Sequence, residues 1–118
     1  MKVISGVENL DTIILENASN NKITLLYFGA IWCGPCKQLK EKLVSSDTIK
    51  SMPQLSAIYL DVDDIMNETL MKRYKVESLP TQIFIRLDNN VVKEVKRIEG
   101  YDFIKLKLEY DYTCNLKN

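Results

Sequence analysis

The chain has 118 residues, of which 46% are hydrophobic and 27% charged, and its 16 Lys and Arg residues balance its 16 Asp and Glu residues. This length and composition predict one globular domain over residues 1–118, and the lack of a basic excess argues against nucleic acid as the main partner. The sequence contains no histidine, which excludes Ser/His and Cys/His nucleophilic catalysis and most transition-metal sites.

The cysteine content and the N-terminus both bear on the compartment. Residues 1–6 contain no apolar stretch of the kind found in a secretory signal, and no apolar run is long enough to span a membrane. A secreted disulfide scaffold of this size usually carries more than three cysteines, in an even number. We therefore expect a cytoplasmic protein with no membrane partner, whose cysteines serve chemistry rather than cross-linking.

Hydrophobic periodicity divides the chain into alternating strands and helices. In chain order the predicted elements are a strand at 2–5, a helix at 7–18, a strand at 23–30, a helix at 33–51, a strand at 55–62, a helix from 63 or 64 to 74, strands at 82–87 and 91–97, and a helix at 102–112. The order β-α-β-α-β-α-β-β-α predicts an α/β fold with helices on both faces of a central sheet. Asp88-Asn89-Asn90 is a hairpin signal, so the sheet is expected to be mixed, with parallel core strands and an antiparallel terminal hairpin.

Two of these helices leave alternatives open. Ser45-Ser46-Asp47 interrupts the helix at 33–51, and there Asp47 is expected to cap a separate last turn. Residues 102–112 alternate apolar and polar positions as a strand would. They also place Phe103, Leu106 and Tyr110 at helical spacing after Asp102, a suitable N-cap. We favour the helix.

The chemical signal is a pair of cysteines, Cys33 and Cys36, at the point where a buried strand passes into a helix. The N-terminus of a helix favours negative charge, so the Cys33 thiol is expected to ionise more readily than a free thiol. A two-residue spacer lets the sulfurs meet, and Pro35 is tolerated in the first helical turn. Gly34 leaves Cys33 uncovered, and Trp32 provides an apolar surface beside it.

A C-x-x-C pair also occurs as half of a metal site, but such a site needs about four ligands. No second C-x-x-C and no histidine is present, so the remaining metal alternative is an ion bridged between two chains. Asp61, Asp63 and Asp64 resemble a metal cluster, but after a strand they are expected to be solvated caps. Cys114 is interpreted as incidental, with a regulatory thiol as the alternative.

The segment Trp32-Cys33-Gly34-Pro35-Cys36-Lys37 resembles the active-site motif of the thioredoxin family. Ser78-Leu79-Pro80-Thr81 resembles that family's cis-proline loop, and Gly100 occupies the place of a glycine that lines its substrate groove. The resemblance covers essentially the whole chain and implies a thioredoxin fold without a cofactor or metal.

The resemblance also implies a role for each motif residue. Cys33 would attack a substrate disulfide, and the more buried Cys36 would then displace the substrate. Pro80 would follow a cis peptide bond, and Leu79 would offer backbone groups to an extended substrate segment. Substrate contacts would come from Trp32, Gly34, Pro35, Leu79, Pro80 and Gly100, with Tyr101 beside them.

The chain departs from the family at three positions. Tyr27 stands six residues before Cys33, where the family usually has a buried Asp, and Tyr59 stands where that Asp's Lys partner aligns. We expect the fold to tolerate the joint loss of both charges, and we expect Cys36 to release substrate more slowly. Glu41 replaces a frequent helix-kinking Pro and is expected to be solvated, the alternative being a substitute carboxylate near the dithiol.

The function expected from these residues is reduction of disulfides in substrate proteins by a monomer that a thioredoxin-reductase-like donor recharges. One alternative is a binding or assembly subunit with little turnover, which the loss of the Asp and Lys makes more credible. Another is a dedicated oxidase or isomerase, against which the Gly-Pro spacer and the absence of an export signal argue.

Overall fold

Five strands form one mixed sheet in the order β1-β3-β2-β4-β5. The computed structural model describes residues 1–116. The strands are β1 (Lys2–Val3), β2 (Ile23–Gly29), β3 (Leu55–Asp61), β4 (Thr81–Asp88) and β5 (Val91–Glu99), and the helices are α1 (Val7–Ser19), α2 (Gly34–Leu43), α3 (Ser46–Ser51), the 3-10 turn η1 (Ile65–Asn67), α4 (Glu68–Arg73) and α5 (Phe103–Cys114). Strands β1, β3 and β2 are parallel, whereas β4 runs antiparallel to β2 and β5 antiparallel to β4.

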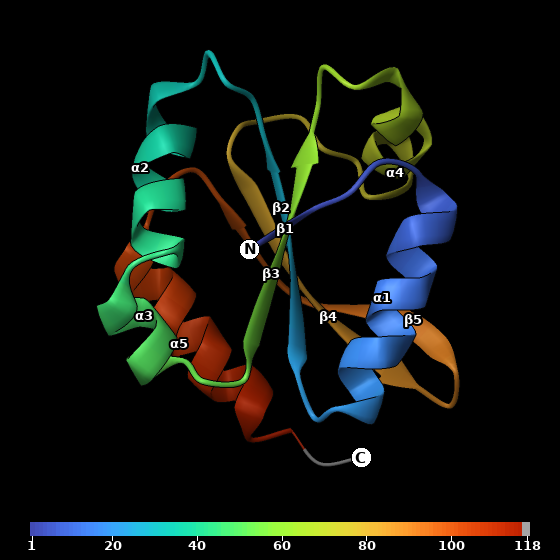
Figure 1. Ribbon diagram of the computed structural model, residues 1–118, viewed down its shortest axis with the longest axis vertical. Coiled ribbons are helices and arrows are strands. Elements are labelled where there is room, and N and C mark those ends of the chain that lie inside the picture. The colour runs from blue at the N-terminus through green and yellow to red at the C-terminus, as the bar shows by residue number, and fades with distance from the viewer. Residues whose placement is uncertain (117–118) are drawn as a thin grey trace.

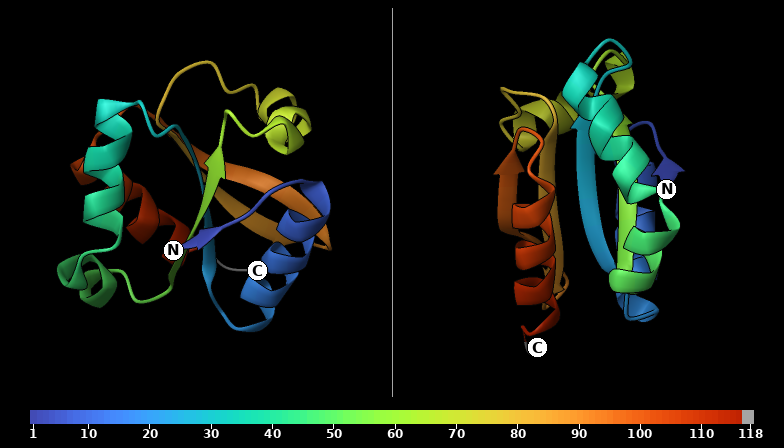
Figure 2. Two further views of the ribbon diagram at one scale, coloured as in Figure 1. Left: turned by 45° about the horizontal axis from the view of Figure 1, so that its top comes forward. Right: turned by 90° about the vertical axis from the view of Figure 1, so that its left-hand side faces the viewer.

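Helices cover both faces of the sheet, as Figures 1 and 2 show. α2, α3 and α5 lie on one face, and α1 and α4 lie on the other. The central strand β2 sends alternate side chains to the two faces. Leu25 and Tyr27 join the core under α2 and α5, and Leu26 and Phe28 join the core under α1. The predicted mixed sheet between two helical layers is therefore confirmed.

The terminal hairpin follows the turn signal directly. Asp88 pairs with Val91, and Asn89 and Asn90 both adopt positive φ angles, of 52° and 64°. Asparagine tolerates this left-handed backbone better than most residues, and two such residues form the turn that suits the twist of a hairpin. No helix among residues 1–116 is long and apolar enough to cross a membrane.

The predicted interruption of the helix at 33–51 is confirmed, but the predicted capping residue, Asp47, is wrong. α2 ends at Leu43, and α3 begins after Ser45, whose side chain accepts a hydrogen bond from the backbone N–H of Thr48. Ser45 therefore caps α3, while Asp47 lies in its first turn, where a carboxylate suits the helix dipole. The prediction of a helix after Asp102 is confirmed, because the Asp102 carboxylate accepts from the N–H of Lys105.

Candidate active site

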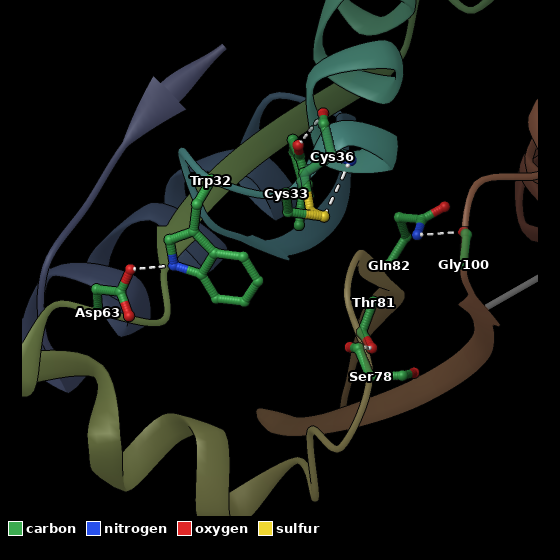
Figure 3. Close-up of a disulfide and its surroundings, with 9 residues drawn as sticks. Trp32, Cys33, Cys36, Asp63, Ser78, Thr81, Gln82 and Gly100 are labelled. Carbon is green, nitrogen blue, oxygen red and sulfur yellow. Dashed lines mark hydrogen bonds between the residues drawn. A yellow bond between two sulfur atoms is a disulfide. The ribbon is translucent and has the colours of Figure 1, made fainter.

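The two cysteines lie at the carboxyl end of β2, where the chain turns into α2. Cys33 is the N-cap of α2 with an extended backbone, and its Sγ accepts a hydrogen bond from the N–H of Cys36 at 3.2 Å. The two residues are disulfide-bonded, with Cα atoms 5.2 Å apart. Figure 3 shows the sulfur bridge at the start of the helix. The pair therefore has the arrangement that the strand-to-helix position predicted.

Exposure differs between the cysteines and the residues around them. The exposed fraction is 7% for Cys33 and 2% for Cys36, whereas Gly34 and Pro35 are exposed. Trp32 is 66% exposed, which confirms that it is not a core residue. Cys33 is thus the more exposed residue of the two, and its neighbours Trp32, Gly34 and Pro35 are open to solvent.

The Trp32 ring is oriented by Asp63, a residue that the sequence predicts to be a solvated cap. Its indole Nε1 donates to the carboxylate of Asp63 at 2.7 Å, a contact drawn in Figure 3. Asp63 follows β3, and β3 lies beside β2, so the sheet brings these two residues together. A hydrogen bond across 31 positions of sequence has no local signal, which explains why Asp63 was missed.

The neighbouring carboxylates serve as local caps. Asp61 accepts from the N–H of Asp63, and Asp64 accepts from the N–H of Met66, each at 2.9 Å. Hydrogen bonds from Ser5 and from the Met66 amide hold the pKa of Asp64 below its usual range. No group of three or more metal-ligating side chains occurs within residues 1–116.

The proline loop and the end of β5 form the other side of the site. The Leu79–Pro80 peptide bond is cis. Thr81 Oγ1 donates to the Ser78 carbonyl at 2.6 Å, which closes the loop, and the Gly100 N–H donates to the Pro80 carbonyl at 2.8 Å. Gly100 has a φ of +90°, an angle that favours glycine.

The fold therefore brings together all the site residues that the sequence singled out. Leu79 and Tyr101 pack against the same apolar cluster as the two cysteines, and Figure 3 shows the proline loop and Gly100 facing the disulfide. Trp32 lies in the β2–α2 connection, Gly34 and Pro35 are the first two residues of α2, and Pro80 lies in the loop before β4.

Beneath the dithiol lies a buried tyrosine. Tyr27 is 1% exposed, and its hydroxyl donates to the backbone carbonyl of Cys36. Its β3 neighbour in the register is Tyr59, whose ring centroid lies 5.1 Å away in an edge-on arrangement. A Cβ on Gly29 would come within 2.9 Å of the Tyr27 ring and 3.1 Å of the Tyr59 ring, so the tyrosine pair depends on that glycine.

Neither tyrosine supplies a charge at neutral pH. Burial, followed by the nearby Tyr59, raises the pKa of Tyr27 far above its ordinary value. Burial also raises the pKa of Tyr59, with contributions from Asp61 and Asp63. The two positions where the family resemblance implies an Asp–Lys pair are therefore occupied by neutral hydroxyl groups.

A glutamine completes this row across the sheet. Gln82 pairs with Tyr27 on the β4 side and is fully buried. Its Nε2 donates to the carbonyls of Ile98 at 3.3 Å and Gly100 at 3.0 Å. The sequence predicts Gln82 only as the first residue of a strand at 82–87. The only sequence feature that could have indicated its buried role is that a polar side chain stands in an otherwise apolar, β-rich run.

Two other polar residues lie away from the dithiol chemistry. Glu41 is exposed on α2, as expected for a solvated side chain. Cys114 is a half-buried free thiol at the end of α5, where its Sγ donates to Gln54 Oε1 at 3.3 Å. Gln54 precedes β3 at the opposite end of the sheet from the disulfide.

Known proteins resemble the chain in both sequence and structure. The family model described as Thioredoxin matches residues 3–107. Thioredoxin-1 of Drosophila yakuba is 42% identical over 89 residues, covering 75% of this chain and 77% of that protein. Thioredoxin H-type 1 of Nicotiana tabacum is 33% identical over 94 residues, covering 80% of this chain and 68% of that protein.

Solved structures match the fold along nearly its whole length. The thioredoxin of Fasciola hepatica superposes with a TM-score of 0.77 at 30% identity, covering 95% of this chain and 98% of that one. The sheet order and the placement of the cysteine pair are thus those of a thioredoxin fold. The chain belongs to the thioredoxin family, and with its Cys33–Cys36 pair it is a thiol–disulfide oxidoreductase.

Proposed function

We propose that this chain reduces disulfide bonds in substrate proteins by dithiol exchange through Cys33 and Cys36. The observation that carries this proposal is the position of the Cys33 sulfur. It caps the N-terminus of α2 and accepts a hydrogen bond from the Cys36 N–H. That N–H and the helix dipole favour a negative sulfur, and a thiolate is the species that attacks a disulfide.

The exchange takes place in two displacements. The Cys33 thiolate attacks one sulfur of the substrate disulfide, so that the substrate S–S bond breaks, a Cys33–substrate disulfide forms and one substrate thiolate leaves. Cys36, deprotonated, then attacks the Cys33 sulfur, which releases the second substrate thiolate and forms the Cys33–Cys36 disulfide. Two electrons pass to the substrate, and its two thiolates take up two protons.

The surroundings of the dithiol suit an extended polypeptide. Among residues 1–116, neither the backbone N–H nor the backbone C=O of Leu79 takes part in a hydrogen bond. A substrate segment would pair with these groups as an added strand. Trp32, Gly34 and Pro35 would contact it from one side, and Pro80 and Gly100 would contact it from the other.

The chain leaves each cycle oxidised, so a second protein must return two electrons and two protons to it. We assign that role to a donor of the thioredoxin-reductase kind, acting on a monomer in the cytoplasm. The donor would attack the disulfide at Cys33, because Cys36 is the more buried of the two residues.

Reduction of insulin by dithiothreitol, followed by the turbidity of the released B chain, tests the proposal. Wild type is expected to accelerate the reaction well above dithiothreitol alone, and Cys33→Ser is expected to abolish the acceleration. Cys36→Ser is expected to retain the first displacement and accumulate a mixed disulfide visible by mass spectrometry. Cys114→Ser is the matched control, because this free thiol lies at the far end of the sheet, and it should behave as wild type.

The second candidate is a binding or assembly subunit that uses the same face without turnover. The specific observation in its favour is the neutral pair Tyr27 and Tyr59 beneath Cys36, which provides no charged group to take a proton from the resolving thiol. Under this alternative, wild type would reduce insulin no faster than dithiothreitol does alone.

A further inference from the structure

The carbonyl of Gly100 lies beyond the end of a strand ladder. The β4–β5 pairing places Thr81 opposite Glu99 and Gln82 opposite Ile98, and β5 ends at Glu99. The Gly100 carbonyl therefore has no backbone partner in the sheet. It is satisfied instead by a side chain, the Nε2 of Gln82 at 3.0 Å, and the same nitrogen also donates to the Ile98 carbonyl.

The amide of Gln82 is an unusual choice for this position. Gln82 is fully buried on the same sheet face as Tyr27 and Phe84, in an otherwise apolar cluster. Within residues 1–116 its Oε1 has no hydrogen-bond partner, and an unpartnered buried oxygen is destabilising. An apolar residue of similar size would avoid that cost, so the benefit of glutamine lies in the two bonds that its nitrogen donates.

Those two bonds act on the wall of the proposed substrate groove. Gly100 donates its own N–H to the Pro80 carbonyl, so the segment Pro80–Gln82 binds both the N–H and the carbonyl of Gly100. A Cβ built on Gly100 would meet nothing within 4 Å, which places this residue beside open space. Figure 3 shows the Gln82 side chain reaching Gly100 across the gap between β4 and the end of β5.

We propose that Gln82 is a positioning residue that holds the Gly100 end of β5 in register with the cis-proline loop, and thereby sets the width of the groove for polypeptide substrates. The proposal rests on the proposed function for its consequence, although the positioning itself does not. It predicts that loss of the Gln82 amide slows reduction of a substrate that fills the groove. It does not slow reduction of a small disulfide that contacts only the two cysteines.

The kinetic test compares two disulfides. Gln82→Met keeps the size of the side chain and removes both donors, and Gln82→Leu serves if the Met variant does not fold. The second-order rate constant of the reduced protein with insulin is expected to fall about three- to tenfold, while that with 5,5′-dithiobis(2-nitrobenzoic acid) stays within about twofold. The proposal would be overturned if Gln82→Met and wild type had equal rate constants with insulin. It would also be overturned if the variant's rate constants fell by the same factor with both disulfides.

The chain contains a matched control amide. Asn17 is also buried, and its Nδ2 donates to Thr24 Oγ1 at 3.0 Å and Ser56 Oγ at 3.1 Å. Thr24 and Ser56 lie near the starts of β2 and β3, the opposite end from the cysteines. Asn17→Leu is therefore expected to lower stability without changing the ratio of the two rate constants. A change in that ratio equal to that of Gln82→Met would also overturn the proposal.

Amide hydrogen exchange separates this inference from the proposed function. In Gln82→Met the Gly100 N–H is expected to exchange at least about threefold faster than in wild type, while the Val62 N–H, bonded to the Gly29 carbonyl, is unchanged. Unchanged exchange at Gly100 would refute the positioning role. A wild type that reduces no disulfide would refute the proposed function, and the exchange result would still decide the role of Gln82.

Discussion

The Tyr27 hydroxyl donates a hydrogen bond to the backbone carbonyl of Cys36. This bond ties β2 to the first turn of α2, directly beneath Cys36. It joins two buried groups, since the exposed fraction is 1% for Tyr27 and 2% for Cys36. The dithiol therefore rests on a neutral tyrosine, and several consequences of that can be measured.

Tyr27→Phe removes this hydroxyl and keeps the ring. We expect the free energy of unfolding of the oxidised protein to fall by about 1 kcal/mol, the usual net value of a buried hydrogen bond. Urea unfolding followed by circular dichroism measures it. Tyr112→Phe is the control, because that ring is 49% exposed, and equal effects of both changes would contradict a specific role for the Tyr27 hydroxyl.

Tyr27→Asp combined with Tyr59→Lys introduces a charged pair at two neighbouring register positions. The carboxylate is expected to accept the proton of Cys36, so release of the mixed disulfide should accelerate about tenfold or more. Tyr27→Asp alone is expected to destabilise the protein by about 3–5 kcal/mol, through the lost ring and an unpaired buried charge. Rapid-quench measurement of the release step checks the first expectation, and no gain in rate would show that proton removal from Cys36 is not slow.

Alkaline pH is expected to destabilise the protein through its buried tyrosines. Burial and the nearby Cys114 raise the pKa of Tyr110 from 10.0 to about 12. Below pH 10 the native and unfolded forms both hold this proton, so its contribution is complete. Between about pH 10 and 12 only the unfolded chain loses the proton, and stability falls by about 1.4 kcal/mol per pH unit for each such group.

Urea unfolding at about pH 9, 10 and 11 measures this slope. Burial raises the pKa of Tyr27 in the same direction, so its effect adds to that of Tyr110. Tyr110→Phe should show a shallower fall with pH, although it starts from lower stability, because the Gln54 N–H loses its acceptor. An identical slope in wild type and variant would rule out Tyr110 as a source of the effect.

Asp63→Ala frees the indole of Trp32. Since Asp63 is exposed, the free energy of unfolding should change by no more than about 1 kcal/mol. Insulin reduction is expected to slow about two- to fivefold, because the ring no longer holds one orientation beside Cys33. Asp47→Ala, an exposed carboxylate in α3, is the control, and a rate equal to wild type in Asp63→Ala would show that ring orientation is unimportant.

Asn67→Ala is expected to weaken the packing of the N-terminal segment. Asn67 is fully buried. Its Oδ1 accepts from the Gly6 N–H at 2.9 Å, and its Nδ2 donates to the Asp61 carbonyl at 3.0 Å. Removing both bonds leaves buried backbone groups unpaired, and the expected loss is about 1–3 kcal/mol. Thermal unfolding measures it, with the exposed Asn9→Ala as control. Equal midpoints for the two variants would contradict the assignment.

Features that depend on neighbours along the chain could be predicted from the amino-acid sequence. The order of strands and helices, the Asn89–Asn90 hairpin turn, the Asp102 cap and the seat of Cys33 at a helix start were all predictable. Each follows from side-chain periodicity or from backbone preferences within a few residues. The N-cap of α3 was predicted wrongly because Ser45 and Asp47 are both good capping residues and stand only two positions apart. Local preferences alone do not choose between them.

The surroundings of the two cysteines, in contrast, depend on contacts between distant parts of the chain. The row of Tyr59, Tyr27 and Gln82 exists because the register of three strands aligns these residues, and the Trp32–Asp63 contact exists because β2 and β3 end side by side. Strand register results from packing the whole sheet between its helices. The partners of a buried hydroxyl or amide are therefore set by residues distant in sequence, and no local pattern records them.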